Sequence, residues 1–135
     1  EDIKLNGHQL GSKVIETIGG INEASRRILS VPTSETEILA LSSSAGAGTY
    51  VTTDIQYIRV SNMDDTNFVR LTFSSGTLNR YDMKLPANRT AIFTSPSISG
   101  SHLDNDTFSS FVDFESMKAA ADTAAVDLEL FVASK

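Results

Sequence analysis

The chain has 135 residues, no cysteine and no tryptophan, and it carries a net charge of −6 with a pI near 4.7. This length fits one domain with a single core, and the lack of cysteine excludes disulfides, cysteine-based zinc sites and cysteine nucleophiles. The acidic balance disfavours nucleic acid and anionic membranes as partners, and no apolar run is long enough to predict a transmembrane helix.

Residues 1–20 form the first unit that the sequence predicts. Scattered apolar residues alternate with glycines, so we expect an extended arm with one short strand over 13–18. We expect this arm to contact a neighbouring subunit through Ile3, Leu5 and Leu10. Packing of the arm on its own domain, or fraying, is the equally weighted alternative.

Residues 21–135 form the second unit, a domain of short strands. Apolar, β-branched and aromatic residues predict strands over 25–31, 35–42, 55–61, 68–74, 79–85, 90–94, 114–121 and 126–133. About eight strands at intervals near ten residues predict an all-β fold, an antiparallel β-sandwich or jelly roll. The segment 114–121 also has helix-forming alanines, but alternation favours a strand there.

Turn residues separate these strands. Pro32 to Ser34 predicts a turn or strand corner, and the Asx-rich segment 62–67 predicts a hairpin between 55–61 and 68–74. Residues 86–89 predict a second hairpin, and Asp122-Thr123 predicts a third, into the last strand. Segments 43–49 and 95–110 are expected to be loops.

The last strand gives the clearest indication of a core. Val126, Leu128, Leu130 and Val132 alternate with residues that must face the other way. We expect these to be buried, together with the inward residues of the two central strands, Ile58, Val60, Val69 and Leu71.

The sequence offers no catalytic constellation and implies no cofactor. His8 and His102 stand in polar, glycine- or serine-rich surroundings without an orienting partner, so we interpret both as solvated. Two acidic clusters are calcium candidates: Asp64-Asp65 with Asn62 and Asn67, and Asp104 with Asp106, the second being preferred. Neither has the twelve-residue spacing of a calcium loop, and turn chemistry is the preferred interpretation of both. We therefore expect no enzyme activity.

Arginine residues are the candidates for protein contact, because the planar guanidinium pairs well with carboxylates. If residues 55–74 form a hairpin, Arg59 and Arg70 lie near each other and can share a docking face. A solvated sheet surface is the alternative.

Three segments carry a family resemblance: 57–69 (YIRVSNMDDTNFV), 84–93 (KLPANRTAIF) and 121–134 (ADTAAVDLELFVAS). They resemble small virion structural proteins of marine tailed bacteriophages. The resemblance extends over roughly 21–135 and transfers no site residues. It implies a capsid decoration or cement protein, assembled in the host cytoplasm into the virion. The implied partners are the major capsid protein and copies of this chain, as a trimer or other homo-oligomer. The capsid floor is then a second surface that the arm could reach, besides a neighbouring subunit.

Other functions remain open from the sequence. A component of the neck, tail or fibre base is the first alternative to a decoration protein. A carbohydrate- or receptor-binding β-sandwich is the second, although the absence of tryptophan removes the strongest anchor for sugar stacking.

Overall fold

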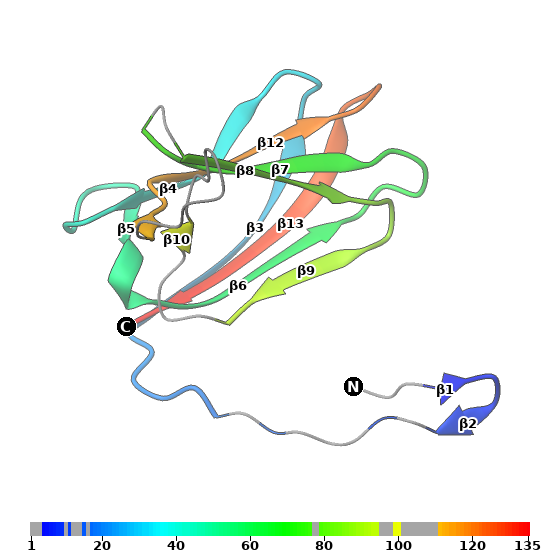
Figure 1. The fold of residues 1–135 in the computed structure, drawn as a ribbon, viewed down its shortest axis with the longest axis horizontal. Coiled ribbons are helices and arrows are strands. Elements are labelled where there is room, and N and C mark those ends of the chain that lie inside the picture. The colour runs from blue at the N-terminus through cyan, green and yellow to red at the C-terminus, as the bar shows by residue number, and fades with distance from the viewer. Residues whose placement is uncertain are drawn as a thin grey trace.

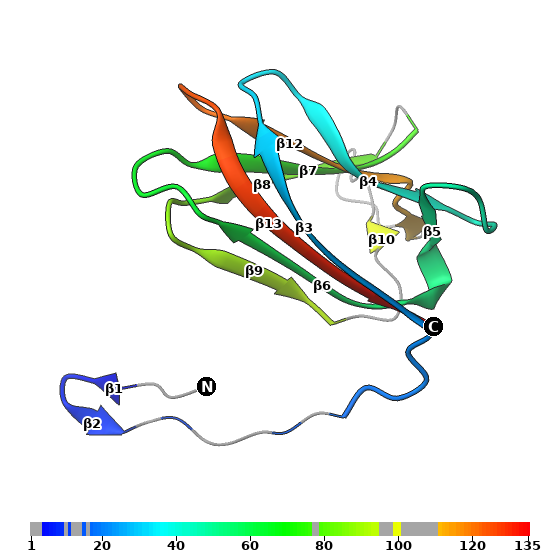
Figure 2. The ribbon, with the colours of Figure 1, turned by 180° about the vertical axis from the view of Figure 1, so that it is seen from behind.

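The computed structural model describes residues 4–9, 11, 15, 17–76, 79–94, 99–100 and 111–135. Its strands form two stacked sheets with the core between them (Figures 1 and 2). One sheet has four strands in the order β3 (Glu23–Val31), β13 (Val126–Ser134), β6 (Ile55–Asn62) and β9 (Thr90–Phe93). The other has five, in the order β5 (Thr49–Val51), β4 (Thr36–Ser42), β12 (Ser116–Ala121), β7 (Val69–Ser75) and β8 (Asn79–Leu85).

The remaining elements are short. A 3₁₀ turn, η1 (Thr52–Asp54), leads into β6. β10 (Ser99–Gly100) lies within the segment predicted to be a loop and pairs with β11 (Val112–Asp113). Near the N-terminus β1 (Lys4–Leu5) pairs with β2 (His8–Gln9). All pairings are antiparallel except that of β4 with β5.

The strand order is that of a jelly roll. Numbering the eight long strands along the chain, without β5, gives the order 1-8-3-6 in one sheet and 2-7-4-5 in the other. This confirms the predicted all-β sandwich. It also confirms the strand over 114–121, because β12 lies between two partners and buries Met117, Ala119 and Ala121. Burial in the sheet overrides the helix preference of alanine.

The three predicted hairpins are wrong. β6 pairs with β13 and β9, whereas β7 lies in the other sheet and pairs with β12 and β8. β8 and β9 are likewise in different sheets, and so are β12 and β13. Each connection is therefore an arch that crosses the core. Segment 32–34, between β3 and β4, is the strand corner that the sequence left open.

The arches gather at one end of the sandwich, away from the C-terminus (Figure 1). Asn62 lies where two of these arches meet, and it is 3% exposed. Its Nδ2 lies 2.9 Å from the carbonyl oxygen of Asn67, 3.3 Å from that of Leu85 and 3.2 Å from that of Pro86. Its Oδ1 accepts a 3.0 Å hydrogen bond from the amide of Asp64. One amide thus joins the β6–β7 arch to the β8–β9 arch.

Asx chemistry shapes the first of these arches. The Asp64 carboxylate accepts hydrogen bonds from the amides of Thr66 and Asn67 at 2.8 and 2.6 Å, and these bonds hold the pKa of Asp64 below its usual range. The tight turn that the sequence predicts is therefore present. It joins two sheets because the strands on either side direct their apolar residues toward each other across the core.

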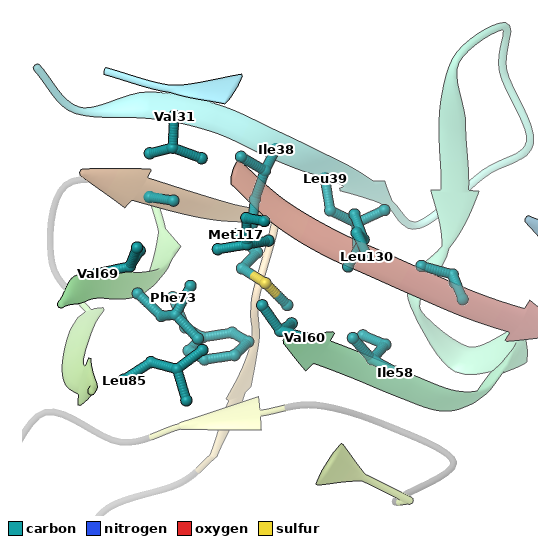
Figure 3. Packing of buried hydrophobic residues seen from close by; sticks show 14 of the residues in the cluster. Val31, Ile38, Leu39, Ile58, Val60, Val69, Phe73, Leu85, Met117 and Leu130 are labelled. Atoms are coloured by element: carbon teal, nitrogen blue, oxygen red, sulfur yellow. The ribbon is translucent and has the colours of Figure 1, made fainter. Parts of the chain in front are cut away.

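The core confirms the predicted buried set. Ile58, Val60, Val69, Leu71, Leu128, Leu130 and Val132 are each at most 1% exposed. Phe73 packs at the centre, with ring centroids 5.1 Å from Phe93 and 5.5 Å from Phe114, and Met117 lies close by (Figure 3). The apolar alternation of these strands was sufficient to identify the buried residues.

The N-terminal segment differs from expectation. Ile15, Thr17 and Ile18 are not in a strand, and the other residues of the predicted 13–18 strand lie outside the described part of the chain. A hairpin over 4–9 is present instead, turned by Asn6 and Gly7 at φ of 51° and 79°. Asn-Gly is the strongest short signal for such a turn. The boundary between arm and sandwich remains a prediction.

Replacing Leu128 with alanine tests the core. The change removes a fully buried side chain of β13, which lies between two strand partners. We expect it to lower the free energy of unfolding by about 2–5 kcal/mol. Met63→Ala, at a side chain that is 51% exposed, is the control and should change it by less than about 0.5 kcal/mol. Chemical denaturation measures both, and equal effects would contradict the assigned core.

Replacing Asn62 with aspartate tests the arches. The carboxylate keeps the size of the side chain but cannot donate to the three carbonyl oxygens, and it repels them. We expect a loss of about 1–3 kcal/mol or more, because buried polar groups are left unpaired. Ser61→Ala, at the half-buried neighbouring position, removes a single 2.9 Å hydroxyl contact with Thr90 on the surface and should be nearly neutral. A stable Asn62→Asp protein would show that the two arches do not depend on this amide.

Candidate interaction surface

The outer surface of the four-stranded sheet collects exposed apolar and arginine side chains. Because Leu128, Leu130 and Val132 of β13 point into the core, Glu129 and Phe131 must point outward. The register places Arg26 and Arg59 on either side of Phe131, and Ile28 beside Glu129. Ile92 of β9 lies opposite Arg59. We call these residues, together with Tyr57, the Phe131 face.

Two arginines hold the single carboxylate of this face. Arg26 donates to Glu129 Oε2 from Nε at 2.8 Å and from Nη2 at 2.5 Å, while Arg59 Nη2 donates to Oε1 at 2.6 Å. The hydrogen bonds from Arg26 and then Arg59 lower the pKa of Glu129 below its usual range. Glu129 is 8% exposed, so the carboxylate lies beneath the two guanidinium groups. Arg26 and Arg59 are thereby fixed in position on the surface.

Aromatic contacts continue this ordered surface. The Phe131 and Tyr57 rings meet edge to face with centroids 5.8 Å apart, and the Arg59 guanidinium carbon lies 5.6 Å from the Phe131 ring centroid. Arg59 Nε is buried without a hydrogen-bond partner among the described residues. Ile28 and Ile92 flank the group at 57% and 55% exposure. Ordered arginines and aromatic rings are typical of the centre of a protein interface, and the exposed isoleucines add apolar surface around them.

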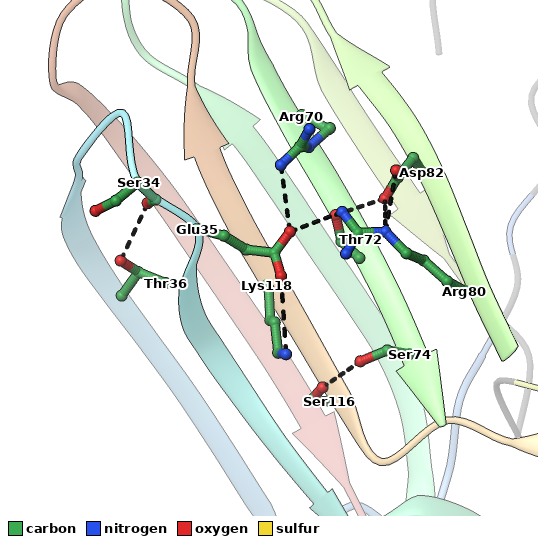
Figure 4. A network of polar contacts seen from close by, with 10 residues as sticks. All are labelled: Ser34, Glu35, Thr36, Arg70, Thr72, Ser74, Arg80, Asp82, Ser116 and Lys118. Carbon is green, nitrogen blue, oxygen red and sulfur yellow. Dashed lines mark hydrogen bonds and ion pairs between the residues drawn. The ribbon is translucent and has the colours of Figure 1, made fainter. Parts of the chain in front are cut away.

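The outer surface of the other sheet has a different character. Glu35 contacts Arg70 at 3.2 Å, Arg80 at 2.7 Å and Lys118 at 3.8 Å (Figure 4). Asp82 joins this network by contacting Arg80 at 3.1 Å. The groups are partly exposed, and such ion pairs contribute little stability. The charged side chains of this surface therefore pair with one another.

The predicted Arg59–Arg70 docking face is therefore wrong as a single surface. Arg59 lies on the four-stranded sheet and Arg70 on the five-stranded sheet, with the core between them. The cause is the arch at residues 62–67, which sends β7 into the opposite sheet. Arg59 keeps its candidate role on the Phe131 face, while Arg70 belongs to the Glu35 network.

The other predicted site residues are only partly described. Ile3, Leu10, Asp104, Asp106 and His102 lie outside the described residues. Leu5 is in β1, but its contacts lie outside what the structure describes, and His8 is exposed in β2.

Sequence reasoning missed Ile28, Ile92 and Phe131 as surface candidates. Their signal was present, since each is a large apolar residue at an outward position of an alternating strand. Only the pairing of β3, β6, β9 and β13 brings them together.

A second feature is an open hollow at the end of the sandwich opposite the arches. Its volume is about 620 Å³, and hydroxyl side chains of Ser42, Ser43, Thr52, Thr53 and Ser75 line part of it. Glu115, also in the lining, accepts a 3.1 Å hydrogen bond from the amide of Gly76. A carbohydrate-binding role, the second alternative from the sequence, would use a hollow of this kind.

Two further observations bear on the class of site. Within the described ranges, no three His, Asp or Glu side chains converge as metal ligands would. In the same ranges, no helix has the length and apolar character needed to span a membrane.

Comparison with known proteins finds only distant likeness, and that in structure. No protein-family profile and no curated protein matches the sequence. One similar solved structure is described as "Bacillus endospore appendages form a novel family of disulfide-linked pili". It is 12% identical, with a TM-score of 0.49, and the match covers 93% of this chain and all of that one. A likeness this distant carries no argument about function.

The Glu129 cluster predicts a pH dependence of stability. Because folding lowers the pKa of Glu129, its contribution is fully present above the unfolded pKa, about 4.3, and is lost as the pH falls through the lower folded value. We expect Glu129→Gln to be less stable than the parent at pH 7, with the difference shrinking below about pH 4. Thermal melts across pH 3–7 measure this.

Glu37→Gln is the matched control for that series. Glu37 is exposed on β4 and makes no ion pair in the described structure. Its variant should follow the parent at every pH. A Glu129→Gln curve that also runs parallel to the parent would contradict a stabilising role for the Arg26–Glu129–Arg59 cluster.

Proposed function

We propose that this protein is a structural component of a tailed-phage virion, a capsid decoration or cement protein. The observation that carries the proposal is the Phe131 face. It presents fixed arginines, aromatic rings and exposed isoleucines on a sandwich whose opposite surface is already satisfied by its own ion pairs. The resemblance of segments 57–69, 84–93 and 121–134 to phage virion proteins supports the same role.

The proposed mechanism is mechanical. A rigid module that binds the assembled head lattice, and not a disassembled subunit, stabilises the lattice by mass action. The jelly roll suits this work because its arches and core fix the Phe131 face without help from a ligand. The major capsid protein is the proposed partner, and contact with other copies of the chain would connect neighbouring positions in the lattice.

The acidic charge is compatible with this placement. A net charge of −6 keeps a free subunit soluble before assembly. It also repels the packaged nucleic acid, so the proposed position is the outer surface of the head. The arginines of the Phe131 face supply a local positive group toward a carboxylate-bearing partner.

Copy number in the particle tests this proposal. The test uses purified particles of a phage whose genome encodes this chain. We expect quantitative mass spectrometry to find hundreds of copies in each particle. The major capsid protein, measured in the same sample, is the internal standard. A dozen copies or fewer would contradict a decoration role and indicate a position in the neck, tail or fibre base. Absence from washed particles would overturn a virion role.

A further inference from the structure

The N-terminal hairpin lacks the support that a hairpin needs. Among the described strands, β1 and β2 pair with each other and with no other strand, and in both views they stand apart from the two sheets (Figures 1 and 2). An isolated two-stranded hairpin is at best marginally stable in water. Ile15, on the chain that follows it, is 73% exposed. The arm thus presents ordered backbone and an apolar side chain that the monomer does not cover.

The Phe131 face lies where such an arm begins. The amide of Asn22 donates to the carbonyl oxygen of Ser134 at 3.0 Å, which fixes the exit of the arm beside the end of β13. The nine residues of β3 extend over about 30 Å, and the ten residues 11–20 can reach about 35 Å when extended. An arm leaving one sandwich can therefore extend along the whole Phe131 face of another.

The arm and the Phe131 face are also complementary in charge and in exposed apolar surface. Around Phe131 the face has two arginines for one glutamate, on a chain that is acidic overall, and Asp127 is exposed further along the same side of β13. Residues 1–20 contain three acidic and two basic residues, so the arm carries the opposite net sign. Ile15 of the arm and Ile28 and Ile92 of the face are all more than half exposed in the monomer. Covering them against each other removes apolar surface from water on both sides.

We propose that the N-terminal arm of one copy binds the Phe131 face of a second copy. In both views the described arm residues lie apart from their own sheets, so the outer surface of the four-stranded sheet is left open to a second copy (Figures 1 and 2). The contact is heterologous, arm to face, so it either closes into a ring or continues from copy to copy. This deepens the proposed function, on which its place in a particle rests, but the contact itself is a property of the purified chain.

Solution size is the first test. We expect sedimentation and light scattering to show a concentration-dependent oligomer of the full chain. Ile28→Glu on the face and Ile15→Glu on the arm should each weaken association at least tenfold. Met63→Glu makes the same change at another apolar side chain that is more than half exposed, near the arches, and it should associate as the parent does. Unchanged melting temperatures show that the variants fold.

Engineered cysteines identify the contact directly, because the chain has no cysteine of its own. Co-expressed Ile15→Cys and Ile28→Cys chains, or Ile15→Cys and Ile92→Cys chains, should form a mixed disulfide on oxidation. Ile15→Cys with Met63→Cys is the control and should not. A parent that stays monomeric, the lack of both mixed disulfides, or an Ile15→Cys/Ile28→Cys double variant that links only within one chain would overturn the proposal. None of these outcomes alters the copy number in the particle, so the two proposals fail separately.

Discussion

The hydrogen bonds of the Asn62 side chain hold together the connections between the two sheets, and the rest of the arrangement depends on these connections. Its buried amide reaches carbonyl groups from both the β6–β7 arch and the β8–β9 arch, so the two connections are held in one fixed geometry. Neighbouring contacts extend the same junction, since Asp122 donates to Phe68 and Ala121 donates to Pro32 through their backbones. A buried polar group with all its partners in place specifies one topology, because slipping any strand would leave it unpaired.

The arches also decide how the two outer surfaces are composed. Each arch moves the next strand into the opposite sheet, so residues close in sequence are separated by the core. Arg59 is thereby placed with Arg26 and Phe131, from the two ends of the domain, while Arg70 joins Glu35. One surface becomes a satisfied network of charges. The other keeps exposed isoleucines around an ordered arginine pair, and it is the surface that both proposals use.

Both proposals treat the molecule as a rigid part and not as a catalyst. The Phe131 face is preorganised because Glu129 fixes its arginines before any partner arrives, which lowers the entropy that binding would cost. One face has to serve the arm of a second copy and the capsid partner. An arm that covers part of it, leaving the rest for the lattice, would couple contact between copies to attachment.

The sequence by itself determined the fold class, the eight long strands of the sandwich and part of its core, because side chains that alternate with period two mark the face that avoids water. It did not predict the short strands β5, β10 and β11. It also contained the Asn6-Gly7 turn, although the signal was overlooked. Only the tertiary structure decided which strands are neighbours. An Asx-rich turn has the same local hydrogen bonds in a hairpin and in an arch, so residues 62–67 could not reveal that they cross the core. The Phe131 face depends on pairings between strands up to a hundred residues apart, and no local pattern encodes these.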